Sequence, residues 1–345
     1  MNLKNSQTSI FLRLIGLPHQ NKPLYTEGID RQAFYTFAKK NRIRLFYLNS
    51  LAEHEQLFNL EHERIILLER YAKISQAFIK IANLLKSFNV NYAFFKSIRP
   101  YTEVTVDIDI LTFGSEYMRV LGFLENAGYL RLGEGPLSTT YRDIDAKINL
   151  DIYEDVGISH FVYMDKNKLS GSICEVNLAD GCIGHSFCPE ADLLAVIAHS
   201  IIKEHMYVLS EYFTTMYYLR RLTRQKLFSF VSLANRCRLR STVKTHLGIT
   251  GLLHYYAHGF IPGKITELLG TLGGSNSLEL YNLVRNNLKV PHKYHLKTMT
   301  TAFFELFKES KTRRSIASQI SSMFNPEFSA SFIKMALEHV FRETY

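Results

Sequence analysis

Three aspartates in the middle of the chain have the residue type and spacing for binding a divalent metal. Asp107 and Asp109 alternate with apolar residues, and this two-residue period places both carboxylates on one face of a predicted strand, roughly 7 Å apart. Asp151 lies on the polar face of a later predicted strand. Magnesium prefers carboxylate oxygens and keeps several waters, so a few convergent acids are typical of its sites. If both strands join one sheet, the three aspartates predict a site for Mg²⁺ or Mn²⁺.

The chemistry that suits such a site is phosphoryl or nucleotidyl transfer. These reactions need little covalent help from the protein, but they need metal ions that neutralise a triphosphate and activate an attacking hydroxyl. An Asp-x-Asp pair alone is also common on polar strand faces. A second pair, Asp143 and Asp145, falls near the turn of a predicted hairpin, where we expect exposure to solvent.

The elements that must position the aspartates begin with helices. Asp30 is suited to cap a helix that ends near Asn41, and apolar residues recur at steps of three and four over residues 63–88. Residues 90–95 and 104–111 read as strands and residues 115–127 as a helix.

Further strands are expected before the chain becomes helical again. Residues 139–153 predict a hairpin, and short strands are expected on either side of Asp180 and Gly181. From Pro189 the pattern is helical almost to the end. The order favours an α+β fold with a small mixed sheet, and we divide the chain into an N-terminal helical region (1–88), a core sheet (89–188) and a C-terminal helical region (189–345).

The order of motifs resembles the nucleotidyltransferase superfamily of the polymerase β type. In that superfamily a glycine–serine turn after a strand holds the triphosphate, the next strand carries Asp-x-Asp, and a later strand supplies a third aspartate. Here Lys96 and Ser97 form the turn, Asp107 and Asp109 follow, and Asp151 matches the third acid.

More narrowly, the chain resembles the bacterial and archaeal group called nucleotidyltransferase family 5. The likeness covers roughly residues 29 to 220. It rests on residues 37–43, on residues 89–97 (which resemble a family strand ending in Lys-Gly), and on residues 189–194 followed by His199.

The resemblance implies a role for each site residue. Asp107 and Asp109 would bind both metal ions, and Asp151 would bind the catalytic ion and activate the acceptor hydroxyl. Lys96 and Ser97 would hold the β and γ phosphates. Lys96 stands where the superfamily has glycine, so the backbone would approach a phosphate less closely, and activity could be altered or lost.

A lysine beyond the sheet is the remaining candidate for nucleotide binding. In toxin-type nucleotidyltransferases a helix after the sheet offers a lysine to the triphosphate, and Lys203 matches it. An ordinary surface charge is an equally good interpretation of Lys203. We expect His199, Lys203 and Glu211 to share one side of a helix, with His199 a hydrogen-bonded core histidine.

The implied activity is transfer of a nucleotide from a nucleoside triphosphate, such as ATP, to an acceptor hydroxyl. The net charge of +9 and the basic stretch between Arg220 and Lys244, which holds no acidic residue, favour RNA as acceptor, for example a tRNA 3′ end. A solvated helical face explains that stretch equally well. A toxin with an antitoxin-like partner is one setting consistent with this.

Three alternatives remain open: transfer to protein, a catalytically degenerate protein that binds nucleotide or RNA, and a sheet that serves only as a partner-binding face. Lys96 in the glycine position supports the degenerate protein. Three clustered carboxylates count against it, since a binder has no need of mutually repelling charges.

Composition sets the remaining expectations. The chain is 46% hydrophobic and 21% charged, an ordinary globular balance, and no apolar run approaches the roughly 20 residues that span a bilayer. We therefore expect a cytoplasmic protein without a membrane partner. Cys174, Cys182, His185 and Cys188 lack the tight knuckles of structural zinc sites, so we expect buried thiols.

Overall fold

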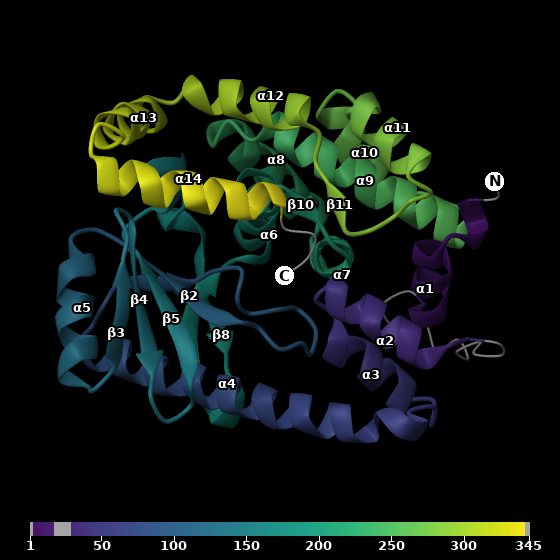
Figure 1. The fold of residues 1–345 in the computed structure, drawn as a ribbon, viewed down its shortest axis with the longest axis horizontal. Helices are drawn as coiled ribbons and strands as arrows, with labels where there is room; N and C mark the ends of the chain where they lie inside the picture. Colours follow the sequence, from purple (N-terminus) through teal and green to yellow (C-terminus); the bar gives the residue numbers. More distant parts are fainter. Residues whose placement is uncertain (1–2, 17–28, 342–345) are drawn as a thin grey trace.

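The computed structural model describes residues 3–16 and 29–341, with side chains through residue 334. Figure 1 shows a twisted sheet, a long helix along one side of it, and helices from both ends of the chain beside it. The helices are α1 (Gln7–Ile15), α2 (Arg31–Lys40), α3 (Arg44–Ala52), α4 (Glu61–Ser87), α5 (Glu116–Asn126), α6 (Pro189–Ala198), α7 (Leu209–Arg221), α8 (Arg224–Arg236), α9 (Arg240–His258), α10 (Gly263–Thr271), α11 (Ser277–Arg285), α12 (Leu296–Phe307), α13 (Ser310–Ser322) and α14 (Pro326–Phe341).

Seven strands form one mixed sheet in the order β3-β4-β5-β2-β1-β9-β8. Its central pair, β2 and β5, is parallel, whereas β1–β2 and β4–β5 are antiparallel. The α+β expectation is therefore confirmed. The strands are β1 (Tyr92–Phe94), β2 (Asp107–Thr112), β3 (Leu130–Glu134), β4 (Ser138–Asp143), β5 (Ile148–Tyr153), β8 (Ile173–Asn177) and β9 (Ile183–Phe187), with two small separate pairs, β6 (Val156–Ile158) with β7 (Phe161–Met164) and β10 (Met206–Tyr207) with β11 (His292–Lys293).

Helices α4 and α5 cover one face of the sheet. Ile108 and Ile110 of β2 pack there with apolar residues of the long helix, such as Phe78 and Ile81. Because side chains alternate along a strand, Asp107 and Asp109 face the opposite side. Toward that side, Tyr153 and Phe187 pack with residues of α6 and α8. The acidic face is thus directed away from α4.

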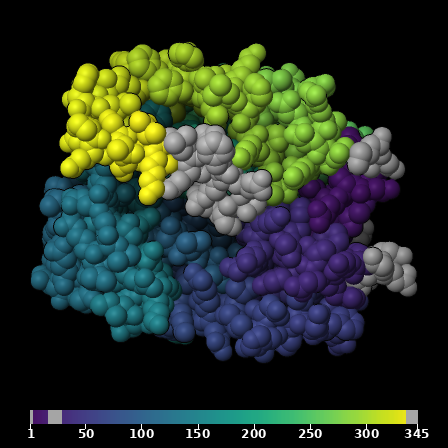
Figure 2. Space-filling model, viewed as in Figure 1, coloured from purple at the N-terminus to yellow at the C-terminus, as the bar shows by residue number. Residues whose placement is uncertain are grey.

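The N-terminal and C-terminal helices share a core. Phe11 and Tyr47 are fully buried in one cluster with Tyr212 of α7 and Ile249 of α9. In the space-filling view the purple N-terminal segment lies against the green helices of the C-terminal region (Figure 2). Within the described ranges, no helix is long and apolar enough to cross a membrane.

Most expected elements are present, with some differences at their ends. Asp30 caps α2, where it accepts a hydrogen bond from the Ala33 backbone, and the hairpin at 139–153 corresponds to β4 and β5. The strands around Asp180 and Gly181 are β8 and β9. Strand β2 begins at Asp107 rather than at 104, since Glu103 accepts hydrogen bonds from the backbone of residues 45, 46 and 104 and holds this segment on the N-terminus of α3. Strand β3 and the β6–β7 and β10–β11 pairs were not expected.

Candidate metal and nucleotide site

The pairing of β2 with β5 brings the three aspartates together. Asp109 lies directly opposite Asp151 in the parallel register, and Asp107 lies one pleat earlier on the same face. One carboxylate oxygen from each of the three lies within 4.8 Å of the others. The expectation that both strands join one sheet is confirmed, and in the part of the chain that the structure describes this is the one cluster of potential metal ligands.

The three carboxylates are mutually repelling and largely buried. Burial, with the charge of Asp109 as the next cause, raises the pKa of Asp107 to about 6. The same two causes raise the pKa of Asp151, whose Oδ1 accepts a 2.6 Å hydrogen bond from the Thr140 hydroxyl. A divalent cation would relieve this repulsion, and carboxylate oxygens are the donors that Mg²⁺ and Mn²⁺ prefer. The donor set therefore fits such an ion.

Asp109 is the most tightly held of the three. It is 2% exposed, its Oδ2 accepts a 2.9 Å hydrogen bond from the Ser97 hydroxyl, and its backbone N–H donates to the same hydroxyl at 2.8 Å. The Lys96 Nζ lies 2.7 Å from Asp109 Oδ1. Burial alone would raise the pKa of Asp109, but the Lys96 ammonium together with Lys203 and His199 outweighs it and the pKa is lowered.

The turn that carries Lys96 and Ser97 has a backbone conformation that favours glycine, although Lys96 occupies that position. Lys96 has φ +52°, a left-handed conformation that a non-glycine residue adopts only at a cost. Its N–H donates a 2.6 Å hydrogen bond to Asp192 Oδ1 in α6, and Asp192 Oδ2 accepts from the Tyr218 hydroxyl at 2.7 Å. Asp192 and Tyr218 hold the turn in place. Residues 189–194, which include Asp192, carry part of the family resemblance. The sequence does not identify Asp192 or Tyr218 as part of the site.

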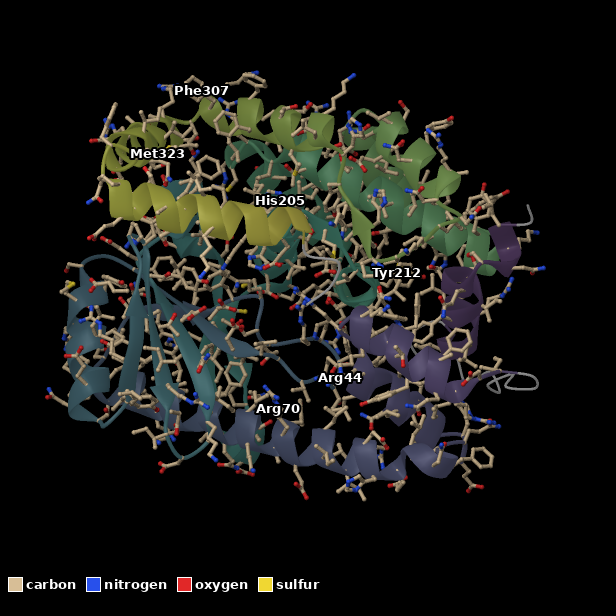
Figure 3. All side chains as sticks on the ribbon, in the orientation of Figure 1. Arg44, Arg70, His205, Tyr212, Phe307 and Met323 are labelled. Atoms are coloured by element: carbon tan, nitrogen blue, oxygen red, sulfur yellow. The ribbon has the colours of Figure 1, made fainter. Side chains whose placement is uncertain are left out.

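The segment around Lys203 differs from the single helix that we expected. Helix α6 continues into a π-helical turn (His199–Lys203). His205 then has a left-handed backbone (φ +53°), β10 follows, and α7 begins at Leu209. Figure 3 labels His205 in this break and Tyr212 in the following helix. The expectation that Glu211 shares a helix with His199 and Lys203 is wrong. Glu211 instead accepts a hydrogen bond from the Val208 backbone at the start of α7.

Lys203 nevertheless lies beside the acidic cluster. Its Nζ lies 3.4 Å from the Tyr153 hydroxyl, and burial, followed by the charge of Lys96, lowers its pKa. His199 Nε2 lies 3.0 Å from Glu204 Oε1. Burial lowers the pKa of His199 to about 3. The expected polar partner of His199 is present, but the side chain is half-buried and not part of the fully buried core.

The second Asp-x-Asp pair lies apart from this site, but only half of it is exposed. Asp145 is exposed, as expected. Asp143 is 1% exposed, which corrects our expectation. It accepts hydrogen bonds from the backbone of Asp145 and Ala146 in the β4–β5 turn and lies 2.9 Å from Lys80 Nζ of α4. Its role in the structure is to hold the hairpin turn against the long helix.

The cysteines form no zinc site among the described residues. Cys174, Cys182 and Cys188 are half-buried, so the expectation of buried thiols is wrong for these three; Cys237, which was not part of that set, is buried.

The basic stretch between Arg220 and Lys244 spans the end of α7, α8 and the start of α9. Part of its charge is already paired: Arg224 lies 3.3 Å from Glu267, and Lys226 lies 3.8 Å from Glu190. Arg240 donates a hydrogen bond to the Leu272 carbonyl.

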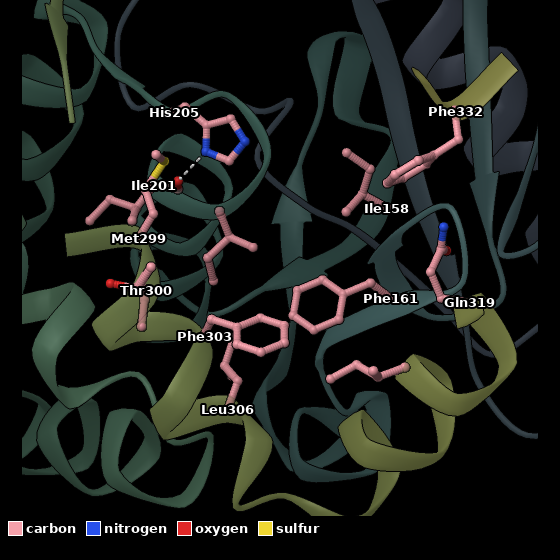
Figure 4. Close-up of a pocket in the computed structure, with 13 residues that line it drawn as sticks. Ile158, Phe161, Ile201, His205, Met299, Thr300, Phe303, Leu306, Gln319 and Phe332 are labelled. Carbon is pink, nitrogen blue, oxygen red and sulfur yellow. Dashed lines mark hydrogen bonds between the residues drawn. The ribbon is translucent and has the colours of Figure 1, made fainter. Parts of the chain in front are cut away.

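A pocket separate from the acidic cluster is apolar and unsuited to a triphosphate. It has a volume of about 470 Å³ and is lined mainly by side chains such as Ile158, Phe161, Met299, Phe303 and Phe332 (Figure 4). Ile201 and Ile202 connect its wall to the π-helical turn of Lys203. Among the described residues that line it there is no acid, lysine or arginine.

Comparison with known proteins adds little. No protein-family model matches the chain, and no curated protein matches it. A solved structure of the STING-associated CdnE c-di-GMP synthase from Capnocytophaga granulosa is 14% identical, and the alignment covers 92% of this chain and 99% of that chain with a TM-score of 0.27. A TM-score of this size does not establish a shared fold.

Proposed function

We propose that this protein is a metal-dependent nucleotidyltransferase, which moves a nucleoside monophosphate from a nucleoside triphosphate to an acceptor hydroxyl. The observation that carries the proposal is the convergence of Asp107, Asp109 and Asp151 within 4.8 Å. Two lysines and a serine hydroxyl lie beside them. Clustered carboxylates in a largely buried position are costly to keep ionised, and binding of divalent cations is the use that explains them best.

Each residue has a proposed part in the reaction. Asp107, Asp109 and Asp151 hold Mg²⁺ or Mn²⁺, which when bound neutralises the triphosphate and favours ionisation of the acceptor hydroxyl. The acceptor hydroxyl gives its proton to solvent and its oxygen bonds to the α-phosphorus. The bond from that phosphorus to the β-phosphate oxygen breaks, and pyrophosphate leaves. Asp151 orients the acceptor hydroxyl, with its own Oδ1 fixed by Thr140.

The cationic and hydroxyl groups stabilise the phosphates. Lys203 lies close enough to Asp109 and Asp151 for their charges to act on its pKa, so a triphosphate held at the cluster would come within its range. Ser97 orients Asp109 through two hydrogen bonds. Lys96 contributes a buried positive charge whose pKa is raised, since the nearby aspartates outweigh the effect of burial.

We propose RNA as the acceptor class, with a 3′ terminal hydroxyl as the nucleophile. The support is the net charge of +9 and the basic helices α8 and α9, because positive surfaces attract polyanions. The pairs that Arg224 and Lys226 make with carboxylates reduce the charge available, so protein acceptors are kept in the test.

A second candidate is a degenerate protein that binds a nucleotide without transferring it. The ion pair between Lys96 and Asp109 favours it, because an internal ammonium already neutralises one of the three acids.

The test is incubation of the purified protein with Mg²⁺ or Mn²⁺, each α-labelled nucleoside triphosphate, and total cellular RNA and protein. We expect metal-dependent label on RNA that disappears in the Asp107→Asn/Asp109→Asn variant. Asp145→Asn is the matched control, since Asp145 is the exposed member of the second pair and lies outside the cluster. Label on protein and not on RNA would show that the acceptor is protein. Tight nucleotide binding without any transferred label would refute the enzyme and leave the degenerate binder.

A further inference from the structure

We infer that the Lys96 ammonium takes the place of a second cation at the acidic cluster, so that this site binds one divalent metal ion and not two. The inference rests on the function proposed above, and it specifies how that site is built. Two-metal sites hold their ions about 3.5–4 Å apart, which requires carboxylates free to coordinate both.

Lys96 prevents the Asp109 carboxylate from coordinating two metal ions. One of its oxygens faces the ammonium at 2.7 Å, and the other accepts the Ser97 hydroxyl at 2.9 Å. One oxygen of this buried carboxylate is therefore ion-paired and the other is hydrogen-bonded. Asp107 has no hydrogen bond to its carboxylate in the described part of the structure, and Asp151 has only the one from Thr140. These two remain the principal ligands for a single ion.

The position of Lys96 is fixed by several independent contacts. Its backbone N–H is held by Asp192, its side chain is 9% exposed, and Nζ lies 5.4 and 5.6 Å from the ring centroids of Phe95 and Tyr153. Aromatic faces at this distance favour a cation. The ammonium is thus held at the cluster by the surrounding structure, as a bound ion would be.

The formal charges agree with a single ion. Three carboxylates and the two lysines Lys96 and Lys203 sum to −1, so one divalent ion brings the site to +1, which attracts a triphosphate. Before a triphosphate binds, a second divalent ion would bring this largely buried site to +3, which is costly without further acids. Removing Lys96 would lower the formal charge by one and free an oxygen of Asp109 for a second ion.

The experiment counts Mn²⁺ at the site by electron paramagnetic resonance, with and without a triphosphate analogue that has a non-cleavable α–β bridge. Two ions about 4 Å apart give an exchange-coupled spectrum, whereas a single ion gives an uncoupled one. We expect one uncoupled ion in the wild type and in Lys96→Arg, and a coupled pair in Lys96→Met. Lys96→Gly suits the left-handed backbone and serves as a second variant should Lys96→Met fold poorly.

Lys80→Met is the matched control. It removes another lysine–aspartate pair, Lys80 with Asp143 at 2.9 Å, outside the cluster, and should leave the ion count at one. A coupled pair in the wild type, with or without the analogue, would overturn the inference. So would a single ion in both Lys96→Met and Lys96→Gly, although the proposed function would stand. Absence of any bound Mn²⁺ in the wild type would overturn the inference and the proposed function together.

Discussion

Asp107→Asn should stabilise the metal-free protein while abolishing its metal binding. In the folded chain the Asp107 carboxylate is largely buried beside Asp109, and its pKa is raised from 3.8 to about 6. Ionisation of this group at neutral pH therefore destabilises the folded state. Asparagine has nearly the same shape and carries no charge, so the substitution removes this cost. Sites built for ligands commonly carry such a stability cost.

The magnitude follows from the pKa. Each tenfold change in an ionisation constant corresponds to about 1.4 kcal/mol, so an increase from 3.8 to about 6 sets an upper bound of about 3 kcal/mol. Water reaches part of the Asp107 side chain, and we expect a gain of about 1 to 2 kcal/mol. For a chain of this length that is a rise in Tm of about 1 to 3 °C.

The pH dependence has a definite sign. Above pH 6 the aspartate is ionised in both states, and the cost is fully present. As the pH falls through 6, the folded protein takes up the proton before the unfolded chain does, so the cost shrinks and disappears near the unfolded value of 3.8. The gain from Asp107→Asn should follow the same course.

The assay is thermal unfolding in EDTA at pH 7.5, 6 and 4.5, repeated at pH 7.5 with Mn²⁺. We expect Mn²⁺ to raise the Tm of the wild type and to leave that of Asp107→Asn unchanged. Asp145→Asn, a substitution at an exposed acid, is the control. A lower Tm for Asp107→Asn in EDTA at pH 7.5, or a gain that persists undiminished at pH 4.5, would refute the reasoning.

Three further predictions concern the same residues and their surroundings. Because Asp107 must lose its proton to bind a cation, the Mn²⁺ affinity measured by calorimetry should rise up to about tenfold per pH unit below 6 and level off above it; a constant affinity from pH 5 to 7 would contradict this. Asp143→Ala should lower the free energy of unfolding by about 1–3 kcal/mol, since it leaves backbone N–H groups of the β4–β5 turn without their acceptor. Asp145→Ala should change the free energy of unfolding by less than about 0.5 kcal/mol. Equal effects of the two substitutions in denaturant titrations would show that the burial of Asp143 is unimportant. Gly157→Ala should destabilise the β6–β7 pair by about 1–3 kcal/mol, because a Cβ there would lie 2.6 Å from the Phe161 carbonyl oxygen; an unchanged denaturation midpoint would contradict that contact.

Local periodicity in the sequence was enough to predict much of the fold. The two-residue alternation around Asp107 and Asp109 placed both acids on one strand face, and the steps of three and four in residues 63–88 predicted α4. Such periods arise from backbone geometry within a few residues. The helix cap at Asp30 and the hairpin of β4 and β5 were predictable for the same reason.

Tertiary structure alone decided which distant residues meet. The parallel pairing of β2 with β5 brings Asp151 opposite Asp109, and no local pattern specifies that partner. The ammonium of Lys96 faces Asp109 because Asp192, from a helix far along the chain, holds the turn. Asp143 is buried because the turn packs beside Lys80, and α6 ends before Lys203 although its apolar pattern continues. In each case the outcome depends on long-range packing and on the pairing of buried charges, which are properties of the folded chain and not of any short segment.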